Sequence, residues 1–231
     1  MEVGIARMIE ATPHPRKLAD ALANAAAISK DSEFVGVNVA EAGAGSCVRA
    51  YGRGRFVMGS GYAYAGDREG QEFEFDPATE VAIEPGEAGA LQTALRKLSS
   101  ARDAKVLVQV DGESLVVMDG GTEVCNLATI ALDWDERCDI DRECSLAMHP
   151  DWELGRDGSP LVLHADVLTT LGKLRPTSTA TAQVLIAIAF PLAGNTAHVQ
   201  IGQSFYGLFE AINTERITDP HWKEALTWAN A

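Results

Sequence analysis

Four aspartates in residues 133–141 are candidate ligands for a hard metal ion. Asp133, Asp135, Asp139 and Asp141 alternate with other residues, as the oxygen ligands of a calcium-type loop do. The stretch lacks the glycine at the sharp turn and the terminal glutamate of an EF-hand. A run of acidic residues is also typical of a solvated loop, so a metal-dependent enzyme using residues 133–141 is a second alternative rather than the first interpretation.

The residues of other common reaction centres do not form recognisable patterns. No cysteine pair has Cys-x-x-Cys spacing, and the histidines form no His-Glu-x-x-His motif. The glycine-rich stretch 52–61 lacks the Gly-Lys-Ser/Thr of a phosphate-binding loop, and no Gly-x-Ser-x-Gly elbow occurs. We therefore predict no enzyme, no catalytic residue, no metal site and no cofactor, with reduced buried thiols at Cys47, Cys125, Cys138 and Cys144.

The composition is that of an ordinary globular protein. Of 231 residues, 46% are hydrophobic and 23% are charged, which excludes a disordered chain. The longest apolar run, residues 184–192, is too short to span a bilayer, and residues 1–15 have no signal-peptide pattern. These features predict a cytoplasmic protein without a membrane partner.

The hydrophobic spacing predicts one arrangement that occurs three times. Apolar residues at three- and four-residue intervals predict helices over residues 15–30, 86–100 and 165–175. Glycine-bounded apolar runs predict three strands after each helix, and the order recurs at about 70 to 80 residues, which indicates an internal repeat. The expected strands are 34–39, 47–51, 56–64, 80–84, 105–110, 114–118, 122–130, 160–164, 183–191, 196–202 and 205–212.

The fold class implied by this order is α+β, with antiparallel strands and helices on one face of the sheets. The acidic, turn-rich stretch 132–159 separates the second unit from the third. We therefore predict a domain over residues 1–133 and a second, partly degenerate domain over residues 134–231.

Charge is distributed unevenly over the units. The formal net charge is -14, yet the three predicted helices and the residues that follow them carry nine basic and four acidic residues. Cations near helix ends favour the macrodipole, but Arg16 and Lys17 stand at a helix start, where acidic residues are preferred. A basic helix surface on an acidic protein can bind phosphates. Its members are Arg16, Lys17, Lys30, Arg96, Lys97, Arg102, Lys105, Lys173 and Arg175.

Several stretches resemble the sliding clamps of DNA replication, which include the bacterial DNA polymerase III β subunit and the proliferating-cell nuclear antigen. The alanine-rich helix end at residues 25–30 and the strand at 34–39 are similar to the first helix and strand of a β-clamp domain. Residues 47–56 resemble its next strand and turn, and residues 81–85 resemble the strand that leads through proline into the second helix. The resemblance covers residues 14–132, whereas residues 160–212 match in element order.

The resemblance implies a processivity factor with no catalytic activity. Such a clamp encircles double-stranded DNA without sequence preference, its basic helices face the phosphates, and short peptides of the DNA polymerase and the clamp loader bind a surface pocket. Arg55, Phe56 and Pro85 match positions that line this pocket. Two domains in each chain imply a homo-oligomer, with a trimer favoured over a dimer. The protein would lie in a bacterial cytoplasm, or in the cytoplasm of the host if a phage encodes it.

One alternative keeps the clamp fold but not the ring. The sequence yields three helix-and-strand units, whereas two complete clamp domains would contain four. A clamp-like, non-catalytic interaction protein, such as a decoy or a virion component, would need no ring.

Overall fold

The computed structural model describes the three expected units. The described residues are 8–32, 34–42, 45–66, 73–76, 79–98, 100–130, 163–175, 186–189, 196–201 and 205–210. Within them the helices are α1 (Pro15–Ile28), α2 (Pro85–Lys97) and α4 (Ala165–Leu171), and a short 3₁₀ turn (Ser29–Asp31) follows α1. The strands are β1 (Ile9–Ala11), β2 (Val35–Ala42), β3 (Gly45–Arg53), β4 (Val57–Ala65), β5 (Val81–Ile83), β6 (Leu107–Val110), β7 (Ser114–Asp119), β8 (Thr122–Ala128), β9 (Ile186–Ala189), β10 (Thr196–Ile201) and β11 (Phe205–Glu210).

The strands form two antiparallel sheets that interlock the first two units. One sheet has the order β1-β6-β7-β8, and the other has the order β5-β2-β3-β4-β11-β10-β9. The strand before each helix pairs with the other unit: β1 precedes α1 but pairs with β6, and β5 precedes α2 but pairs with β2. Because of this exchange, the described residues between 8 and 130 share one core and do not form two independent units.

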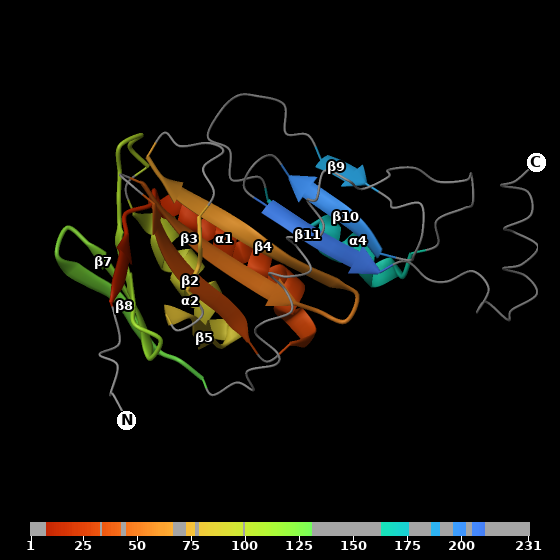
Figure 1. The fold of residues 1–231 in the computed structure, drawn as a ribbon, viewed down its shortest axis with the longest axis horizontal. Coiled ribbons are helices and arrows are strands. Elements are labelled where there is room, and N and C mark those ends of the chain that lie inside the picture. Colours follow the sequence, from red (N-terminus) through yellow and green to blue (C-terminus); the bar gives the residue numbers. More distant parts are fainter. Residues whose placement is uncertain are drawn as a thin grey trace, which may run out of the picture.

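The third unit extends the larger sheet. Strand β11 pairs with β4 in antiparallel register, with Phe205 opposite Gly61 and Phe209 opposite Val57. Segments nearly 150 residues apart in sequence therefore lie side by side, as Figure 1 shows for the orange β4 and the blue β11. The predicted domain boundary at residues 133–134 lies outside the described residues and stays a prediction.

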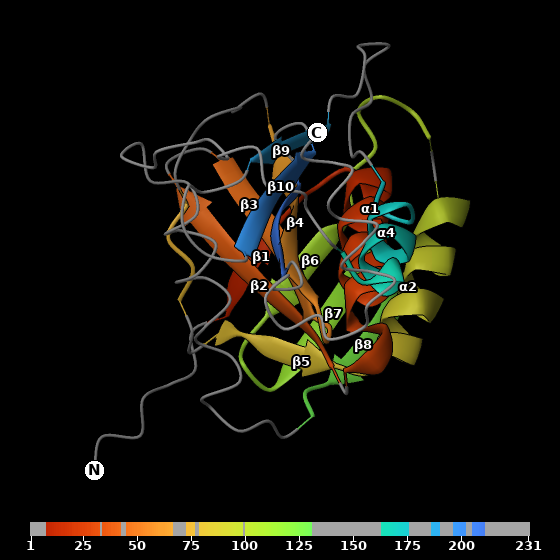
Figure 2. The same ribbon diagram turned by 90° about the vertical axis from the view of Figure 1, so that its right-hand side faces the viewer.

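The helices lie together on one side of the strands, as predicted (Figure 2). Helix α1 can approach β3 and β4 closely because small residues face each other. A Cβ atom at Gly61 would lie 2.9 Å from the Cα of Ala21, and one at Gly52 would lie 2.4 Å from the carbonyl oxygen of Ala25. The alanine-rich sequence of α1 is therefore a packing requirement.

The main differences from the sequence-based expectation are at short strands. Strand β1 was not predicted, because three residues are too few to show alternation. The strand predicted at 160–164 is wrong at its end: Leu163 and His164 are not in a strand, and the His164 side chain accepts a hydrogen bond from the Asp166 N–H at the start of α4. Residues 160–162 lie outside the described part of the chain.

None of the helices in the described ranges is both long and apolar enough to cross a membrane.

Candidate nucleic-acid interface

Helix α1 provides the centre of the basic surface. Pro15 occupies its first turn, and the His14 ring accepts a hydrogen bond from the Arg16 N–H at 3.1 Å, which caps the helix. Leu18 and Leu22 are buried against the sheets. The opposite stripe is therefore directed away from the core, and Arg16 is exposed on it.

Helix α2 lies beside α1 and contributes two cations in its last turn. Glu84 and Glu87 form a capping box at the N-terminus of α2. Arg96 and Lys97 are exposed near the C-terminus, where positive charge is favourable. Helix α2 thus has acidic residues at its N-terminus and basic residues at its C-terminus, as the helix dipole favours. Its C-terminal end adds positive charge to the layer formed by α1, α2 and α4, called the helix layer below.

The segment after α4 is joined directly to α1. The Asn24 amide donates to the carbonyl oxygen of Arg175 at 2.9 Å and accepts from its N–H at 2.7 Å. Asn24 is buried, whereas the side chains of Lys173 and Arg175 are exposed. Cations from a distant part of the sequence are thereby placed beside those of α1.

The remaining predicted cations lie at the ends of the helices. Arg102 and Lys105 are exposed on the connection between α2 and β6, which the His14 ring contacts through the carbonyl oxygen of Ala101 at 2.9 Å. Lys30 is exposed in the 3₁₀ turn after α1, and Lys17 is half-buried. All nine predicted residues therefore lie on the three helices or the segments that follow them.

One acidic residue lies among these cations and was not singled out from the sequence. The Arg96 guanidinium donates to the Asp20 carboxylate at 2.8 Å, across the α1–α2 contact. Burial raises the pKa of Asp20 above its usual value, while the positive charges of Arg96, Arg175 and Arg16 act to lower it. The three arginines that act on the Asp20 carboxylate come from three separate segments, and Arg96 contacts it directly.

Exposed positive charge is scarce elsewhere. In the described ranges, Arg53 and Arg55 are the exposed basic residues outside the helices and their following segments. Acidic residues predominate on the strands and turns, and they include Glu10, Glu41, Glu74, Asp76, Asp111, Glu113, Asp119, Glu123 and Glu210. In the described ranges, exposed basic residues are therefore concentrated on the helices and the segments that follow them, which also carry the exposed acids Glu84, Asp103 and Asp166.

The predicted peptide pocket is only partly brought together. Arg55 lies over the ring of Phe56, with 5.0 Å from its guanidinium carbon to the ring centroid, and Phe56 stacks on His164 with centroids 4.6 Å apart. The Glu210 N–H donates to the Phe56 carbonyl oxygen, so this turn lies at the junction with the third unit. Pro85 follows β5, which β2 and β3 separate from β4. Its part in the pocket stays a prediction.

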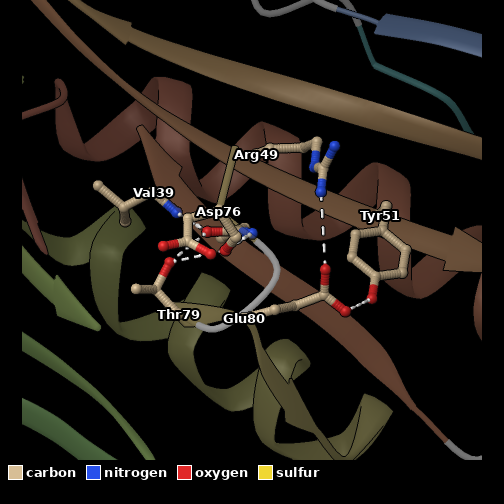
Figure 3. A network of polar contacts seen from close by, with 7 residues as sticks. Val39, Arg49, Tyr51, Asp76, Thr79 and Glu80 are labelled. Carbon is tan, nitrogen blue, oxygen red and sulfur yellow. Dashed lines mark hydrogen bonds and ion pairs between the residues drawn. The ribbon is translucent and has the colours of Figure 1, made fainter. Parts of the chain in front are cut away.

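A buried polar network on the sheet face away from the helices was missed from the sequence (Figure 3). The Arg49 and Glu80 side chains, each 4% exposed, form an ion pair at 3.6 Å, and the Tyr51 hydroxyl donates to the other oxygen of Glu80. Thr79 donates to the Asp76 carbonyl oxygen at 2.9 Å. The contacts of Glu80 with Arg49 and Tyr51 hold Glu80 against β3, immediately before β5.

The described residues offer little for metal or thiol chemistry. They contain no group of three or more His, Cys, Asp or Glu side chains that could hold a metal ion. The proposed metal loop at residues 133–141 lies outside the described part of the chain, as do Cys138 and Cys144. Burial raises the pKa of the Cys47 thiol, and that of the half-buried Cys125 to about 11. Both thiols are therefore protonated at neutral pH.

Comparison with solved structures identifies the architecture. The chain is similar to the DNA polymerase sliding clamp of Bacillus subtilis, at 12% identity and a TM-score of 0.58, over 92% of this chain and 67% of the clamp. The DNA polymerase III β subunit of Thermotoga maritima matches at 12% identity and 0.57, over 94% and 67% of the chains. The Pseudomonas aeruginosa clamp matches at 13% and 0.56, over 95% and 67%.

These matches establish the sliding-clamp fold, as predicted, and the chain spans about two thirds of the length of those clamps. No protein-family model and no curated protein matches the sequence.

Proposed function

We propose that this protein is a DNA sliding clamp, a non-catalytic processivity factor that encircles double-stranded DNA and tethers a replicative polymerase. The observation that supports this most is the separation of charge on a clamp fold. The helices lie on one side of the strands (Figure 2), and α1, α2 and the segment after α4 carry the exposed cations, whereas acidic residues predominate on the strands and turns. Such a layer binds phosphates without reading bases, which suits movement along DNA.

The proposed ring is a homo-oligomer, with a trimer favoured over a dimer. The chain has about two thirds of the length of the clamps that it resembles. A ring of six clamp domains would need three copies of a two-domain chain, which is why we favour a trimer. Strand β8 is an edge of its sheet in the described part of the chain. Pairing between such edges of neighbouring subunits would satisfy their backbone hydrogen bonds and close the ring.

The proposed partner site is the turn that carries Arg55 and Phe56. It lies where the first unit meets the third, beside His164, and combines an exposed cation with an aromatic ring. We assign this junction to short peptides of the polymerase and the clamp loader. A role at replicating DNA would place the protein in a bacterial cytoplasm, or in that of the host if a phage encodes it.

A charge-reversal experiment tests the DNA-binding layer. Replacing Arg96 and Lys97 by Glu is expected to weaken binding to duplex DNA and to reduce the slope of log K against log salt by about 1 to 2. Arg53→Glu is the control, because Arg53 is exposed on a strand outside the helix layer. Equal effects of the helix and strand variants would contradict the proposed interface.

A loading experiment tests encirclement. The protein loaded onto nicked circular DNA is expected to be lost when the circle is linearised, because a ring can slide off a free end. Retention on linear DNA would contradict sliding. Light scattering gives the number of subunits in the same preparation.

The second candidate is a clamp-like interaction protein that forms no ring. The described residues contain one unit, α4 with β9–β11, beside the complete pair of units in residues 8–130. A strict monomer at high concentration that stays folded and binds no DNA would favour this candidate.

A further inference from the structure

Asp20 is an acidic residue within the basic helix layer, and its contact is directed at one of the predicted DNA-binding cations. The carboxylate oxygen accepts from the Arg96 guanidinium at 2.8 Å. The Asp20 side chain is 24% exposed and that of Arg96 is 37% exposed, so the pair lies at the surface that a duplex would approach. In this geometry Arg96 already holds an anion.

Three arginines act on the Asp20 carboxylate. Arg16 lies one turn earlier on α1, and Arg175 is fixed beside α1 by the two backbone hydrogen bonds to Asn24. Arg16 and Arg175 both act on the Asp20 carboxylate electrostatically, together with Arg96. Asp20 therefore neutralises charge at the place where cations from three segments meet.

An acidic residue at position 20 contributes little to the stability of the fold. Asp20 is the sixth residue of α1, and the N-terminus of α1 is capped by His14. A partly exposed ion pair contributes about 0 to 1 kcal/mol. Because burial raises the pKa of Asp20, the ionised carboxylate weakens the folded state above that pKa, compared with a carboxyl of ordinary pKa. The gain from the ion pair is therefore offset.

We propose that Asp20 competes with DNA phosphates for Arg96 and thereby limits how tightly the helix layer holds a duplex. The inference rests on the proposed DNA-binding function and concerns the regulation of the same surface. With Arg96 bound to Asp20, fewer counterions leave the DNA on association, so the contact is weaker and less dependent on salt. A clamp that must slide benefits from such a limit.

The test uses the full-length protein with Asp20→Asn, which keeps the size of the side chain but removes its charge. The salt slope is expected to steepen by about 1, and the affinity to rise about three- to eightfold at roughly 0.1 M salt, because one more cation can contact phosphate. Asp119→Asn is the matched control, since Asp119 is an exposed acid at the β7–β8 turn. It is expected to leave both quantities nearly unchanged.

A double variant tests the proposed route through Arg96. In an Arg96→Ala background, Asp20→Asn is expected to gain much less affinity than it does in the wild type. Thermal unfolding of each variant verifies the fold, and we expect similar midpoints because a partly exposed ion pair contributes little to stability.

The outcomes separate the two proposals. If the wild type binds duplex DNA but Asp20→Asn and Asp119→Asn change affinity equally, the role of Asp20 is overturned and the proposed function stands. An undiminished effect of Asp20→Asn in the Arg96→Ala background would likewise overturn the competition for Arg96. If folded wild type and every folded variant fail to bind DNA, both proposals are overturned.

Discussion

The two faces of the seven-stranded sheet are buried by different means. On the helix face, Val37, Val48 and Ala63 belong to an apolar core shared with α1 and α2. On the other face, Arg49 and Glu80 are buried as an ion pair. The helix face therefore depends on the sizes of its residues, whereas the other face depends on matched polar partners. A substitution should cost more where it breaks a buried pair than where it shifts an apolar contact.

Glu80→Ala tests the polar face and has the largest expected effect. The substitution removes the carboxylate that contacts the 4%-exposed Arg49 side chain and accepts from Tyr51. Breaking a buried pair from one side costs about 3–5 kcal/mol, because the remaining charge stays buried. Urea unfolding measures the loss. The exposed Glu74→Ala is the control, and a loss below about 1 kcal/mol for Glu80→Ala would contradict a polar origin of stability on this face.

Gly61→Ala tests the helix face. The added Cβ would lie 2.9 Å from the Cα and 3.1 Å from the carbonyl oxygen of Ala21, so the backbone of α1 must move away from β4. Such overpacking costs about 1–3 kcal/mol.

A second glycine provides a control substitution that is expected to stabilise the protein. Gly89 lies within α2, and a Cβ there meets nothing within 4 Å. Gly89→Ala is expected to stabilise the protein by about 0.5–1 kcal/mol, because alanine favours the helix. Equal effects of the two substitutions on the urea midpoint would contradict the idea that position 61 requires glycine because α1 packs closely against it.

Local sequence patterns were enough to predict most of the fold. The three-and-four spacing in residues 15–30 predicts α1, and the apolar runs predict β2–β4 with end errors of a few residues. They also predict β9–β11 as far as the structure describes those strands. The pairing of β11 with β4 could not be predicted, because it joins distant residues whose apolar patterns would fit several neighbours. Likewise, nothing local indicates that β1 and β5 pair across units.

The candidate site was predicted less completely, for the same reason. Counting charges along the helices finds Arg96 and Arg175, but it treats Asp20 as one acid among four. Only the folded arrangement places Asp20 against Arg96, 76 residues away, and near Arg175. The burial of Arg49 could not be predicted either. Its partner Glu80 is distant in the sequence, and arginine and glutamate side chains are usually exposed.

Asn24→Ala has the smallest expected loss of stability, and it tests a polar contact on the helix side of the sheet. Its amide satisfies both backbone groups of Arg175. Because Arg175 is exposed, water can replace part of this bonding, so we expect a loss of about 1–2 kcal/mol. Faster hydrogen exchange at the Arg175 amide would locate the loss at this junction. Exposed Asn126→Ala is the control, and unchanged exchange at Arg175 would show that Asn24 does not hold the third unit against α1.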